Sequence, residues 1–293
     1  MSLLENFTED LLEEAAIEIL DELGYEYKFG PDIAYDGETP ERKDYKEVIL
    51  ENRVKDALFR INKDIPISAL EDAFRQIITF NNPSLVENNR YFHRLLVEGI
   101  EVSFKEKDLI RTKRAYLIDF EHKDRNDFMV VNQFTIQGIE NRRPDLILFI
   151  NGIPLIVIEL KSASDENVGI ENAYYQIQTY KKDIEPLFNY NAFCIISDGI
   201  NAKAGTITSD FERFMNWRTV DGINIALLTI PQYETLFKGM LSKERILDII
   251  SNFILFQESV TSDYDEKGKK LGDKKSVIKI LAAYHQYFAV KKA

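Results

Sequence analysis

The chain has 293 residues, of which 45% are hydrophobic and 29% are charged, a composition typical of a soluble globular protein with a sizeable core. Its 37 basic and 49 acidic residues give a net charge of −12, which disfavours a protein that grips nucleic acid over its whole surface. One cysteine excludes an internal disulfide, and with only three histidines a usual zinc site is excluded as well. The acidic N-terminus and the lack of any apolar run of roughly 20 residues predict a cytoplasmic protein with no membrane contact.

The first half of the sequence is predicted to be an N-terminal helical cluster. A helix is expected between the capping residue Thr8 and Gly24, because apolar residues recur there at helical spacing. Three further stretches show the same periodicity, over 45–62, 68–80 and 84–96. We expect these stretches to form a helical insert over about 44–96.

The pattern then changes to strands. Segments rich in β-branched and aromatic residues predict strands, and two nearly continuous apolar runs predict central strands buried on both faces. A helix is expected over about 168–184. The expected strands cover 97–104, 113–120, 127–137, 145–150, 154–160, 192–198 and 223–230. Together they predict an α/β fold with a mixed β-sheet flanked by helices, in which a catalytic core covers about 97–230.

The C-terminal part has a different composition. Residues 1–260 are expected to form one domain, and the polar, glycine-bearing stretch over 261–275 is interpreted as a linker. Residues 276–293 have helical periodicity and are expected to begin a further domain that continues beyond this chain.

Three charged residues stand at the ends of the two central strands. Asp145 follows Pro144 before the first strand, and Glu159 and Lys161 lie at the end of the second. Two carboxylates suit a magnesium-like ion, and a nearby lysine completes the set that phosphodiester hydrolysis needs. This is the pattern of a PD-(D/E)xK nuclease site, with Asp145, Glu159 and the Leu160 carbonyl as ligands of Mg²⁺, for which Mn²⁺ can substitute. Glu-Leu-Lys alone would more often mark only the end of a buried strand. The presence of Pro144-Asp145 before the first strand favours the nuclease site over that interpretation.

The loop between these strands decides whether the two carboxylates meet. A strict two-residue turn at 151–152 would send Glu159 to the face opposite Asp145. A three-residue loop over 151–153, with its glycine in the left-handed conformation, would place Asp145 directly opposite Glu159. Because the site requires that arrangement, the three-residue loop is predicted.

The helix after the second strand carries Gln176 and Tyr180, four residues apart and therefore on one face. They are candidates to support the site or to contact the DNA backbone, although ordinary packing would produce the same spacing. Basic residues that could provide local positive charge are Arg142, Arg143, Lys181 and Lys182. A solvated surface explains any single one of them equally well.

The sequence also resembles the N-terminal part of the R (HsdR) subunit of type I restriction enzymes. The resemblance covers nearly the whole chain. The matching stretches are EEAAIEILDELGY, ENRVKDALFRIN, NRYFHRLLVEGI, NDFMVVNQFTIQG, RRPDLILFINGIPLIVIELK, QIQTYKKDIEPLFNYNAFCIISDG, AGTITSDFERFMNWRT and YHQYFAVKKA.

This resemblance implies an endonuclease domain of the RecB-like branch of PD-(D/E)xK enzymes, with Asp145, Glu159 and Lys161 as catalytic residues. It makes Gln176 and Tyr180 the QxxxY element. It also places the acidic residue of the first helix on Glu14, as a further metal-site carboxylate, with Glu13 as a neighbouring candidate and surface charge as the alternative for either.

The resemblance further implies partners and cofactors. In the family an ATP-driven translocase domain follows the nuclease, so ATP is expected to bind only the full-length subunit, and Gln286 resembles an adenine contact at the entry to that domain. Double-stranded DNA, the methyltransferase (M) subunit and the specificity (S) subunit are the expected partners, and cleavage is expected to be non-specific in sequence. Two alternatives stay open, a non-catalytic docking or regulatory module of the same complex and a nickase or repair nuclease with the same core.

Overall fold

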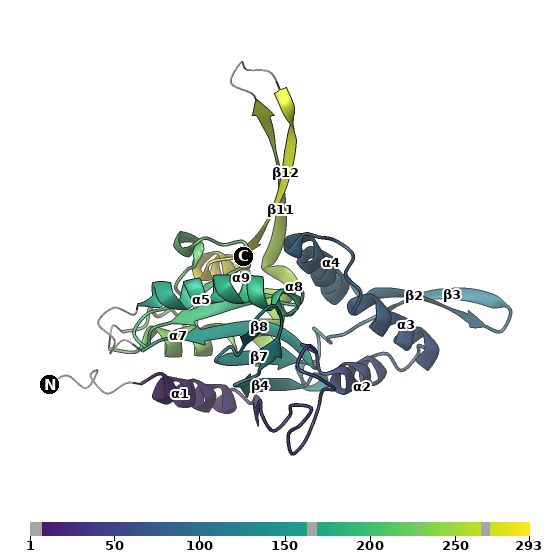
Figure 1. Cartoon of the computed structure of the whole chain (residues 1–293), viewed down its shortest axis with the longest axis horizontal. Coiled ribbons are helices and arrows are strands. Elements are labelled where there is room, and N and C mark those ends of the chain that lie inside the picture. The colour runs from purple at the N-terminus through teal and green to yellow at the C-terminus, as the bar shows by residue number, and fades with distance from the viewer. Residues whose placement is uncertain (1–7, 163–168, 228, 265–269) are drawn as a thin grey trace.

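The computed structural model describes residues 8–162, 169–227, 229–264 and 270–293, and for 261–264 and 270–274 it describes the backbone. Its centre is a six-stranded sheet in the order β1-β4-β7-β8-β9-β10 (Figure 1). These strands are β1 (Glu26–Phe29), β4 (Phe128–Asn132), β7 (Leu146–Ile150), β8 (Ile153–Leu160), β9 (Phe193–Ser197) and β10 (Ala202–Gly205). β1 pairs with β4, and β8 with β9, in parallel, whereas the other neighbours are antiparallel. The expected mixed α/β fold is therefore confirmed.

Helices cover this sheet. α1 (Glu9–Glu22) contacts β1 and β8, and α5 (Ile170–Asp183) contacts β8 and β9. Thr8 caps α1 as predicted, because its side chain accepts a hydrogen bond of 3.4 Å from the backbone N–H of Leu11. The other helices are α2 (Glu51–Ile61), α3 (Ile67–Ile77), α4 (Leu85–Glu98), α6 (Glu185–Phe188), α7 (Gln232–Met240), α8 (Lys243–Asn252) and α9 (Tyr284–Lys292), with the 3₁₀ turns η1 (Lys123–Arg125) and η2 (Phe211–Arg213). In the described chain, no helix has the length and apolar character that a membrane crossing requires.

The turn between β7 and β8 corrects the predicted three-residue loop. Ile150 pairs with Ile153, so the turn has two residues, Asn151 and Gly152, with φ angles of 53° and 78°. Positive φ at both positions is the geometry of a tight hairpin turn that favours Asn-Gly. A Cβ on Gly152 would lie 2.7 Å from the Leu50 carbonyl oxygen, so the packing around this turn also requires glycine.

A β-bulge restores the register that the short turn would have lost. Pro154 pairs with Phe149, but the next pair joins Ile156 to Leu148, so Leu155 is the extra residue in β8. Proline has no N–H to donate to a ladder, which makes a bulge beside Pro154 inexpensive. From the bulge onward, each residue of β8 faces the partner that the three-residue loop would have given it.

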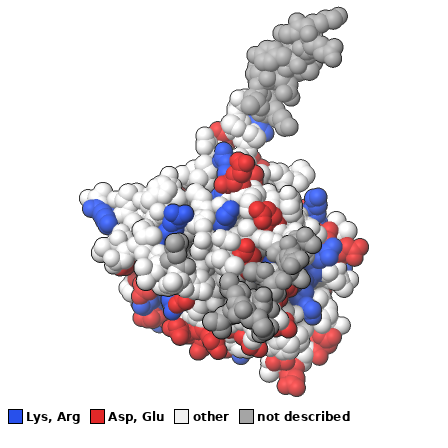
Figure 2. Space-filling model, turned by 90° about the vertical axis from the view of Figure 1, so that its left-hand side faces the viewer, with Lys and Arg blue, Asp and Glu red and all other residues white. Residues whose placement is uncertain are grey.

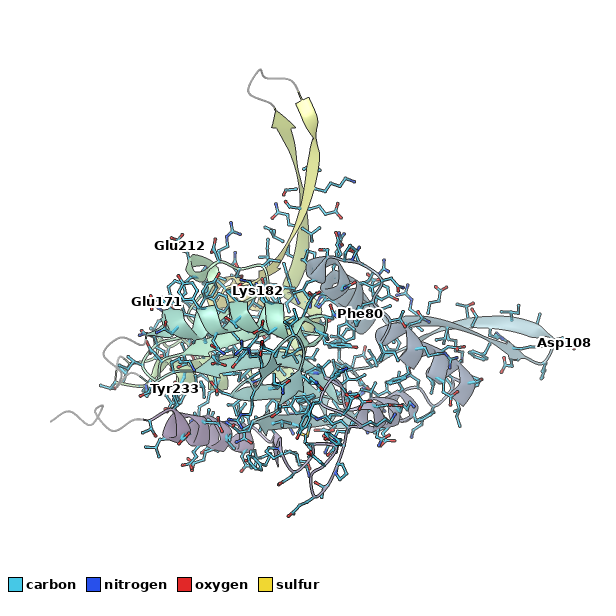
Figure 3. The ribbon with its side chains drawn as sticks, in the orientation of Figure 1. Phe80, Asp108, Glu171, Lys182, Glu212 and Tyr233 are labelled. Atoms are coloured by element: carbon cyan, nitrogen blue, oxygen red, sulfur yellow. The ribbon has the colours of Figure 1, made fainter. Side chains whose placement is uncertain are left out.

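Two hairpins project from the body of the molecule (Figure 1). β2 (Ile100–Glu106) and β3 (Leu109–Ala115) were expected within the main sheet, but they pair only with each other and extend away from it. Asp108 lies at the far end of this hairpin (Figure 3). A short pair, β5 (Ile136–Gln137) with β6 (Asn141–Arg142), lies apart from the main sheet.

The second projecting hairpin corrects the predicted linker. β11 (Ile254–Tyr264) pairs with β12 (Lys270–Leu281) along almost their whole length, whereas a linker was expected over 261–275 and a helix from 276. Residues 265–269 of that linker lie outside the described residues. Beyond the base of the ribbon, the side chains of 257–260 and 275–276 are exposed, and the sequence there is mostly polar, without the apolar alternation that would indicate a strand.

Polar contacts fix the base of this ribbon to the body. Lys279, which is 2% exposed, donates hydrogen bonds of 2.8 Å to the Asn89 side-chain oxygen and 2.7 Å to the Asn191 carbonyl. Arg90 forms an ion pair with Glu258 on the facing strand. The ribbon is therefore attached to α4 and to the start of β9.

The strand predicted over 223–230 is wrong for the residues that the structure describes there, because 223–227 and 229–230 lie in no strand. The edge strand β10 forms an isolated bridge through Ala204 with Met215. Of the residues that follow Trp217, 218–227 and 229–230 lie in no strand, although the sequence over 223–230 alternates as a strand would.

Candidate functional site

Asp145 and Glu159 lie at facing positions at one end of the central strands. Because the ladder pairs Leu146 with Ile158, Asp145 and Glu159 follow as the next facing pair. Directly opposed residues have β-carbons about 5 Å apart, close enough to share an ion. Asp145 and Glu159 therefore face each other as expected, and the bulge at Leu155 produces this register.

The Asp145 carboxylate is buried against the end of β8. Its Oδ2 accepts a hydrogen bond of 2.6 Å from the backbone N–H of Leu160. Burial raises the pKa of Asp145 to about 6, although the hydrogen bond from Leu160 and the charge of Lys161 oppose that rise. The carboxylate is therefore positioned by the backbone and is costly to ionise without a nearby cation.

Glu159 is more deeply buried, at 1% exposure. Burial, followed by the charge of Asp145, raises the pKa of Glu159 to about 8. Its Oε1 lies 3.0 Å from the Lys161 ammonium, while its buried Oε2 has no hydrogen-bond partner among the described residues. A buried oxygen without a donor costs free energy, so this atom is suited to a ligand that supplies positive charge.

Lys161 joins the two carboxylates to α1. Its ammonium lies 3.0 Å from Glu159 and 3.4 Å from Glu9, and it donates a hydrogen bond of 3.0 Å to the Leu160 carbonyl. Burial lowers the pKa of Lys161, but the charges of Glu159 and Asp145 outweigh burial and raise it overall. The lysine is thus held as a cation over the acidic pair.

A third acidic group enters from α1, and it is Glu13 rather than Glu14. The Glu13 carboxylate accepts hydrogen bonds of 2.7 Å from the Asn132 amide and 3.1 Å from the Gln133 amide at the end of β4. Its charge helps to raise the pKa of Asp145. Glu14 is exposed on the outer side of the helix, so the geometry favours the neighbouring candidate.

Asn132 and Gln133 were missed by sequence reasoning. Gln133 has a φ of 53°, and its backbone N–H donates a hydrogen bond of 3.3 Å to the Asp145 carbonyl. A non-glycine residue in the left-handed region is uncommon and often lies near a functional site. No local pattern could reveal the pair, because only the pairing of β4 with β7 brings them to Asp145.

The predicted Gln176 and Tyr180 pair reaches the site from α5. The Tyr180 hydroxyl donates a hydrogen bond of 3.4 Å to the Arg143 carbonyl. Burial, then the charges of Glu159 and Asp145, raise the pKa of Tyr180 above its usual range, against a hydrogen bond with Gln176. Tyr180 therefore lies beside the carboxylates, and Gln176 forms a hydrogen bond with Tyr180.

The four basic residues predicted around the site divide into two groups. Arg142 forms an ion pair of 2.5 Å with Asp183, and Lys181 donates hydrogen bonds of 2.6 Å to the Gln178 side chain and to the Ile207 carbonyl. Arg143 and Lys182 are exposed, and Figure 3 shows Lys182 toward the end of α5 opposite Glu171. Only this second group has its charge turned to solvent in the present arrangement.

The donor set fits a hard divalent cation that keeps part of its water shell. In the described part of the chain, no group of three or more His, Cys, Asp or Glu side chains is arranged to hold a metal. Two facing carboxylates and the Leu160 carbonyl form a smaller set, and Mg²⁺ commonly binds through one or two carboxylates plus waters and phosphates. A cation there would offset the burial and the mutual repulsion of Asp145 and Glu159.

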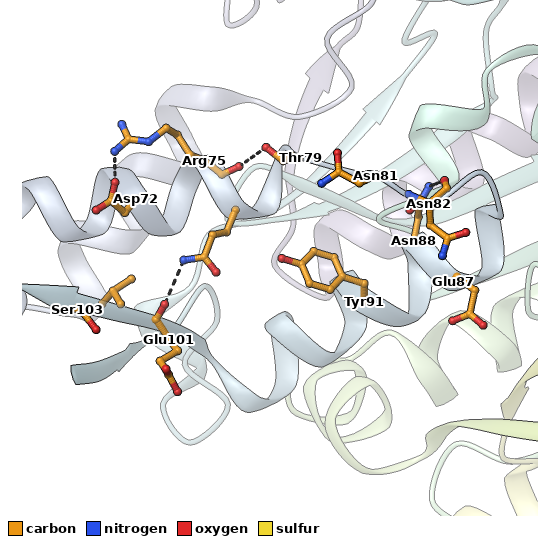
Figure 4. A pocket seen from close by; sticks show the side chains of 12 residues that line it. Asp72, Arg75, Thr79, Asn81, Asn82, Glu87, Asn88, Tyr91, Glu101 and Ser103 are labelled. Atoms are coloured by element: carbon orange, nitrogen blue, oxygen red, sulfur yellow. Dashed lines mark hydrogen bonds and ion pairs between the residues drawn. The ribbon is translucent and has the colours of Figure 1, made fainter.

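A groove of about 920 Å³ lies elsewhere, between α3, α4 and β2 (Figure 4). Its polar side chains are largely engaged with the surrounding chain: Arg75 pairs with Asp72, the Gln76 amide donates to the Glu101 carbonyl, and the Thr79 hydroxyl donates to the Arg75 carbonyl. None of the residues that line it belongs to the Asp145 site. The chemistry therefore points to the end of β8 rather than to this groove.

Comparison with known proteins decides the family. Residues 6–213 match the family model for the Type I restriction enzyme R protein N terminus. The chain belongs to this family. It is 34% identical over 289 residues to the Type I restriction enzyme HindI endonuclease subunit of Haemophilus influenzae, covering 97% of this chain and 26% of that protein.

A second member of the R-subunit family gives the same coverage. The putative type I restriction enzyme MjaIXP endonuclease subunit of Methanocaldococcus jannaschii is 32% identical over 303 residues, which cover 97% of this chain and 27% of that protein. The chain thus spans about a quarter of the length of these R subunits.

Proposed function

We propose that this chain is the nuclease module of a type I restriction R subunit and that it cleaves double-stranded DNA at a PD-(D/E)xK site. The observation that carries the proposal is the facing pair of buried carboxylates, Asp145 and Glu159, with the Lys161 ammonium 3.0 Å from Glu159. Burying two acids side by side is unfavourable unless a cation joins them. That cost is characteristic of a metal-dependent active site rather than of a structural core.

Asp145, Glu159 and the Leu160 carbonyl would hold Mg²⁺, or Mn²⁺ in its place. When bound, the ion supplies Lewis-acid chemistry at a phosphate and lowers the pKa of a bound water. Lys161 would stabilise negative charge that develops on the scissile phosphate, and its ammonium is already held over the acidic pair by Glu9 and Glu159. Glu13 would act as a further carboxylate, oriented by the amides of Asn132 and Gln133.

Tyr180 and Gln176 would support the site from α5. Tyr180 is 3% exposed, so it packs beside Glu159 and limits the orientations available to that carboxylate. Arg143 and Lys182, whose side chains face solvent, are the nearest candidates for phosphate contacts. Arg142 and Lys181 would have to leave Asp183 and the Ile207 carbonyl before they could contact DNA.

The charge distribution suggests that DNA is delivered to the site. The net charge is −12, and Figure 2 shows acidic side chains gathered along the lower part of one face, with Lys and Arg in small groups. A protein that held DNA by itself would need a larger basic surface, because phosphate contacts dominate affinity. An ATP-driven translocase domain of the full-length subunit, with the M and S subunits, would hold the DNA and select the site, and cleavage itself would be non-specific in sequence.

Plasmid cleavage by the full-length subunit in its assembled complex tests this proposal. Asp145→Ala and Lys161→Ala should each reduce cleavage by at least about 10²–10³-fold while ATP-driven translocation continues. Cleavage at the wild-type rate by either variant would show that the assignment is wrong. Linear product from supercoiled plasmid is expected, and a product that stays nicked would indicate a nickase.

α1 offers a matched pair of control variants. Glu13→Gln should lower cleavage by about tenfold, because the group orients or completes the metal site. Glu14→Gln, one residue away and exposed, should leave cleavage within about twofold of the wild-type rate. Equal effects of the two variants would remove Glu13 from the proposed site.

A further inference from the structure

A hollowed apolar surface lies beside Trp217, between the loop that precedes β10 and the start of α7. It consists of Ile200, Val220, Ile225, Leu227 and Ile230, which we call the apolar ledge. Their exposed fractions are 44%, 42%, 59%, 70% and 39%. Two adjoining hollows of about 480 and 300 Å³ share Ile225, Leu227 and Ile230 as lining residues, so the ledge is continuous rather than scattered. Contiguous exposed apolar surface of this kind marks an interaction site in a folded protein.

Hydrogen bonds within 218–230 hold the backbone that carries the ledge. Ile223, Ile225 and Leu227 alternate in the sequence as they would in a strand, yet 223–224 form a bend and residues 223–227 and 229–230 belong to no strand. Ala226 N–H donates to the Arg218 carbonyl at 2.9 Å and Ile230 N–H to the Leu227 carbonyl at 3.0 Å. The exposed apolar side chains leave the adjacent hollows open to an incoming apolar segment.

The last helix of the chain lies directly beside the ledge. The Lys292 ammonium donates a hydrogen bond of 3.0 Å to the Gly222 carbonyl, and a Cβ on Gly222 would lie 2.2 Å from the Phe288 ring. The Trp217 and Phe288 rings have centroids 5.8 Å apart. α9 therefore ends in fixed contact with the segment that carries the apolar side chains.

We propose that the apolar ledge is the docking surface for the part of the full-length R subunit that follows Ala293. The matched relatives are about four times as long as the region they share with this chain, and the family model describes the N terminus of the R protein. A segment that continues from α9 starts beside the ledge, so tethering gives it an effective concentration that a free partner lacks. The rim is of mixed charge, with Arg218, Asp221, Glu234 and Lys238, as is usual for an interface between domains of one chain.

Cysteine accessibility tests the proposal in the full-length subunit and in the 293-residue chain. Leu227→Cys places a thiol on the ledge, and Ile110→Cys places one on the remote β2–β3 hairpin, where Ile110 is 81% exposed. The native Cys194 is buried and gives little background within this region. In the 293-residue chain both variants should react with a maleimide at similar rates, whereas in the full-length subunit Leu227→Cys should react at least tenfold more slowly.

Three outcomes would overturn the proposal. Similar rates for the two variants in the full-length subunit would leave the ledge open to solvent there. Protection of Leu227→Cys that rises with protein concentration in the 293-residue chain would assign the ledge to a second copy. Protection that appears only when M and S subunits are added would assign it to them. Because no cleavage is measured, these outcomes are independent of the proposed nuclease activity.

Discussion

The backbone N–H of Leu160 donates a hydrogen bond of 2.6 Å to the Asp145 carboxylate, which ties the start of β7 to the end of β8. One side chain thus has two roles, because the carboxylate we propose as a metal ligand also closes the central ladder. The two roles can be separated, since an amide oxygen can accept the same hydrogen bond but is a much poorer ligand for a hard cation.

Asp145→Asn should retain the fold and lose the metal response. We expect its free energy of unfolding to be no more than about 1 kcal/mol below that of the wild type, because Leu160 keeps an acceptor. Asp145→Ala should be less stable than Asp145→Asn by about 1–3 kcal/mol, since it leaves a buried N–H unpaired. Thermal unfolding with and without Mn²⁺ measures both effects. If Mn²⁺ raised the Tm of Asp145→Asn as much as that of the wild type, the proposal that Asp145 binds the metal would be contradicted.

Asn151→Ala should destabilise the chain more than most substitutions in a turn do. The Asn151 side chain accepts from the Asp127 N–H at 2.7 Å and donates to the Leu117 carbonyl at 2.8 Å, and its φ is 53°. Loss of these bonds and the strain of a left-handed alanine should together lower the free energy of unfolding by about 2–4 kcal/mol in urea titrations. Asn81→Ala, an exposed asparagine, should change it by less than about 0.5 kcal/mol.

The buried Lys279 should make the free energy of unfolding depend on pH between about 7 and 10. Burial lowers its pKa from 10.5 to about 7, with the Cys194 thiol as the opposing influence. The other titratable neighbour is His93, whose pKa burial and then Lys279 lower to about 3. In the unfolded chain, Lys279 keeps its proton up to about pH 10.5. Between pH 7 and 10 the unfolded chain therefore binds more protons than the folded chain, so the contribution of Lys279 to stability rises with pH.

The variant Lys279→Met isolates this contribution. The free energy of unfolding of the wild type relative to the variant should rise by about 2–3 kcal/mol from pH 7 to pH 9, at 1.36 kcal/mol per pKa unit. Denaturant titrations at both pH values measure the difference. Comparing the wild type with Lys279→Met cancels the effects of the other titratable groups. A difference that does not change with pH would mean that Lys279 stays charged when buried.

Gly239→Ala should destabilise α7 even though alanine is the better helix former. A Cβ there would lie 2.4 Å from Cδ1 of Trp217, so the ring or the helix must shift. We expect a loss of about 1–3 kcal/mol, which exceeds the gain of about 1 kcal/mol in helix propensity. The emission of the single tryptophan reports the displacement directly, and Gly169→Ala, where the nearest atom is the end of the Glu171 side chain, is the tolerated comparison.

Long apolar periodicity predicted most of the helices and the central strands. α1 and α2–α5 lie within or near their predicted ranges, because each buries an apolar stripe that is visible in the sequence. β7 and β8 are buried at every residue, so their continuous apolar runs indicated them directly. β1 was missed because its four residues are mostly exposed and show no alternation.

The rest depended on contacts that no local pattern records. The sequence of 223–230 has the alternation of a strand, but alternation does not provide a partner. Asp145, Glu159 and Lys161 were predicted to lie together because two carboxylates and a lysine at the ends of apolar runs match the pattern of a metal-dependent nuclease site, and the structure places them in contact. Gln133 was not found, since its position beside Asp145 arises from the pairing of β4 with β7.

The bulge at Leu155 has a genetic consequence. Deleting one residue between Asn151 and Ile158 would rotate the end of β8 by half a turn, and the new inward face would still be almost entirely apolar, because β8 is buried on both sides. Such a deletion leaves the hydrophobic content of the strand nearly intact while it moves Glu159 and Lys161 away from Asp145. The proposed site therefore constrains the length of this short hairpin more tightly than folding does.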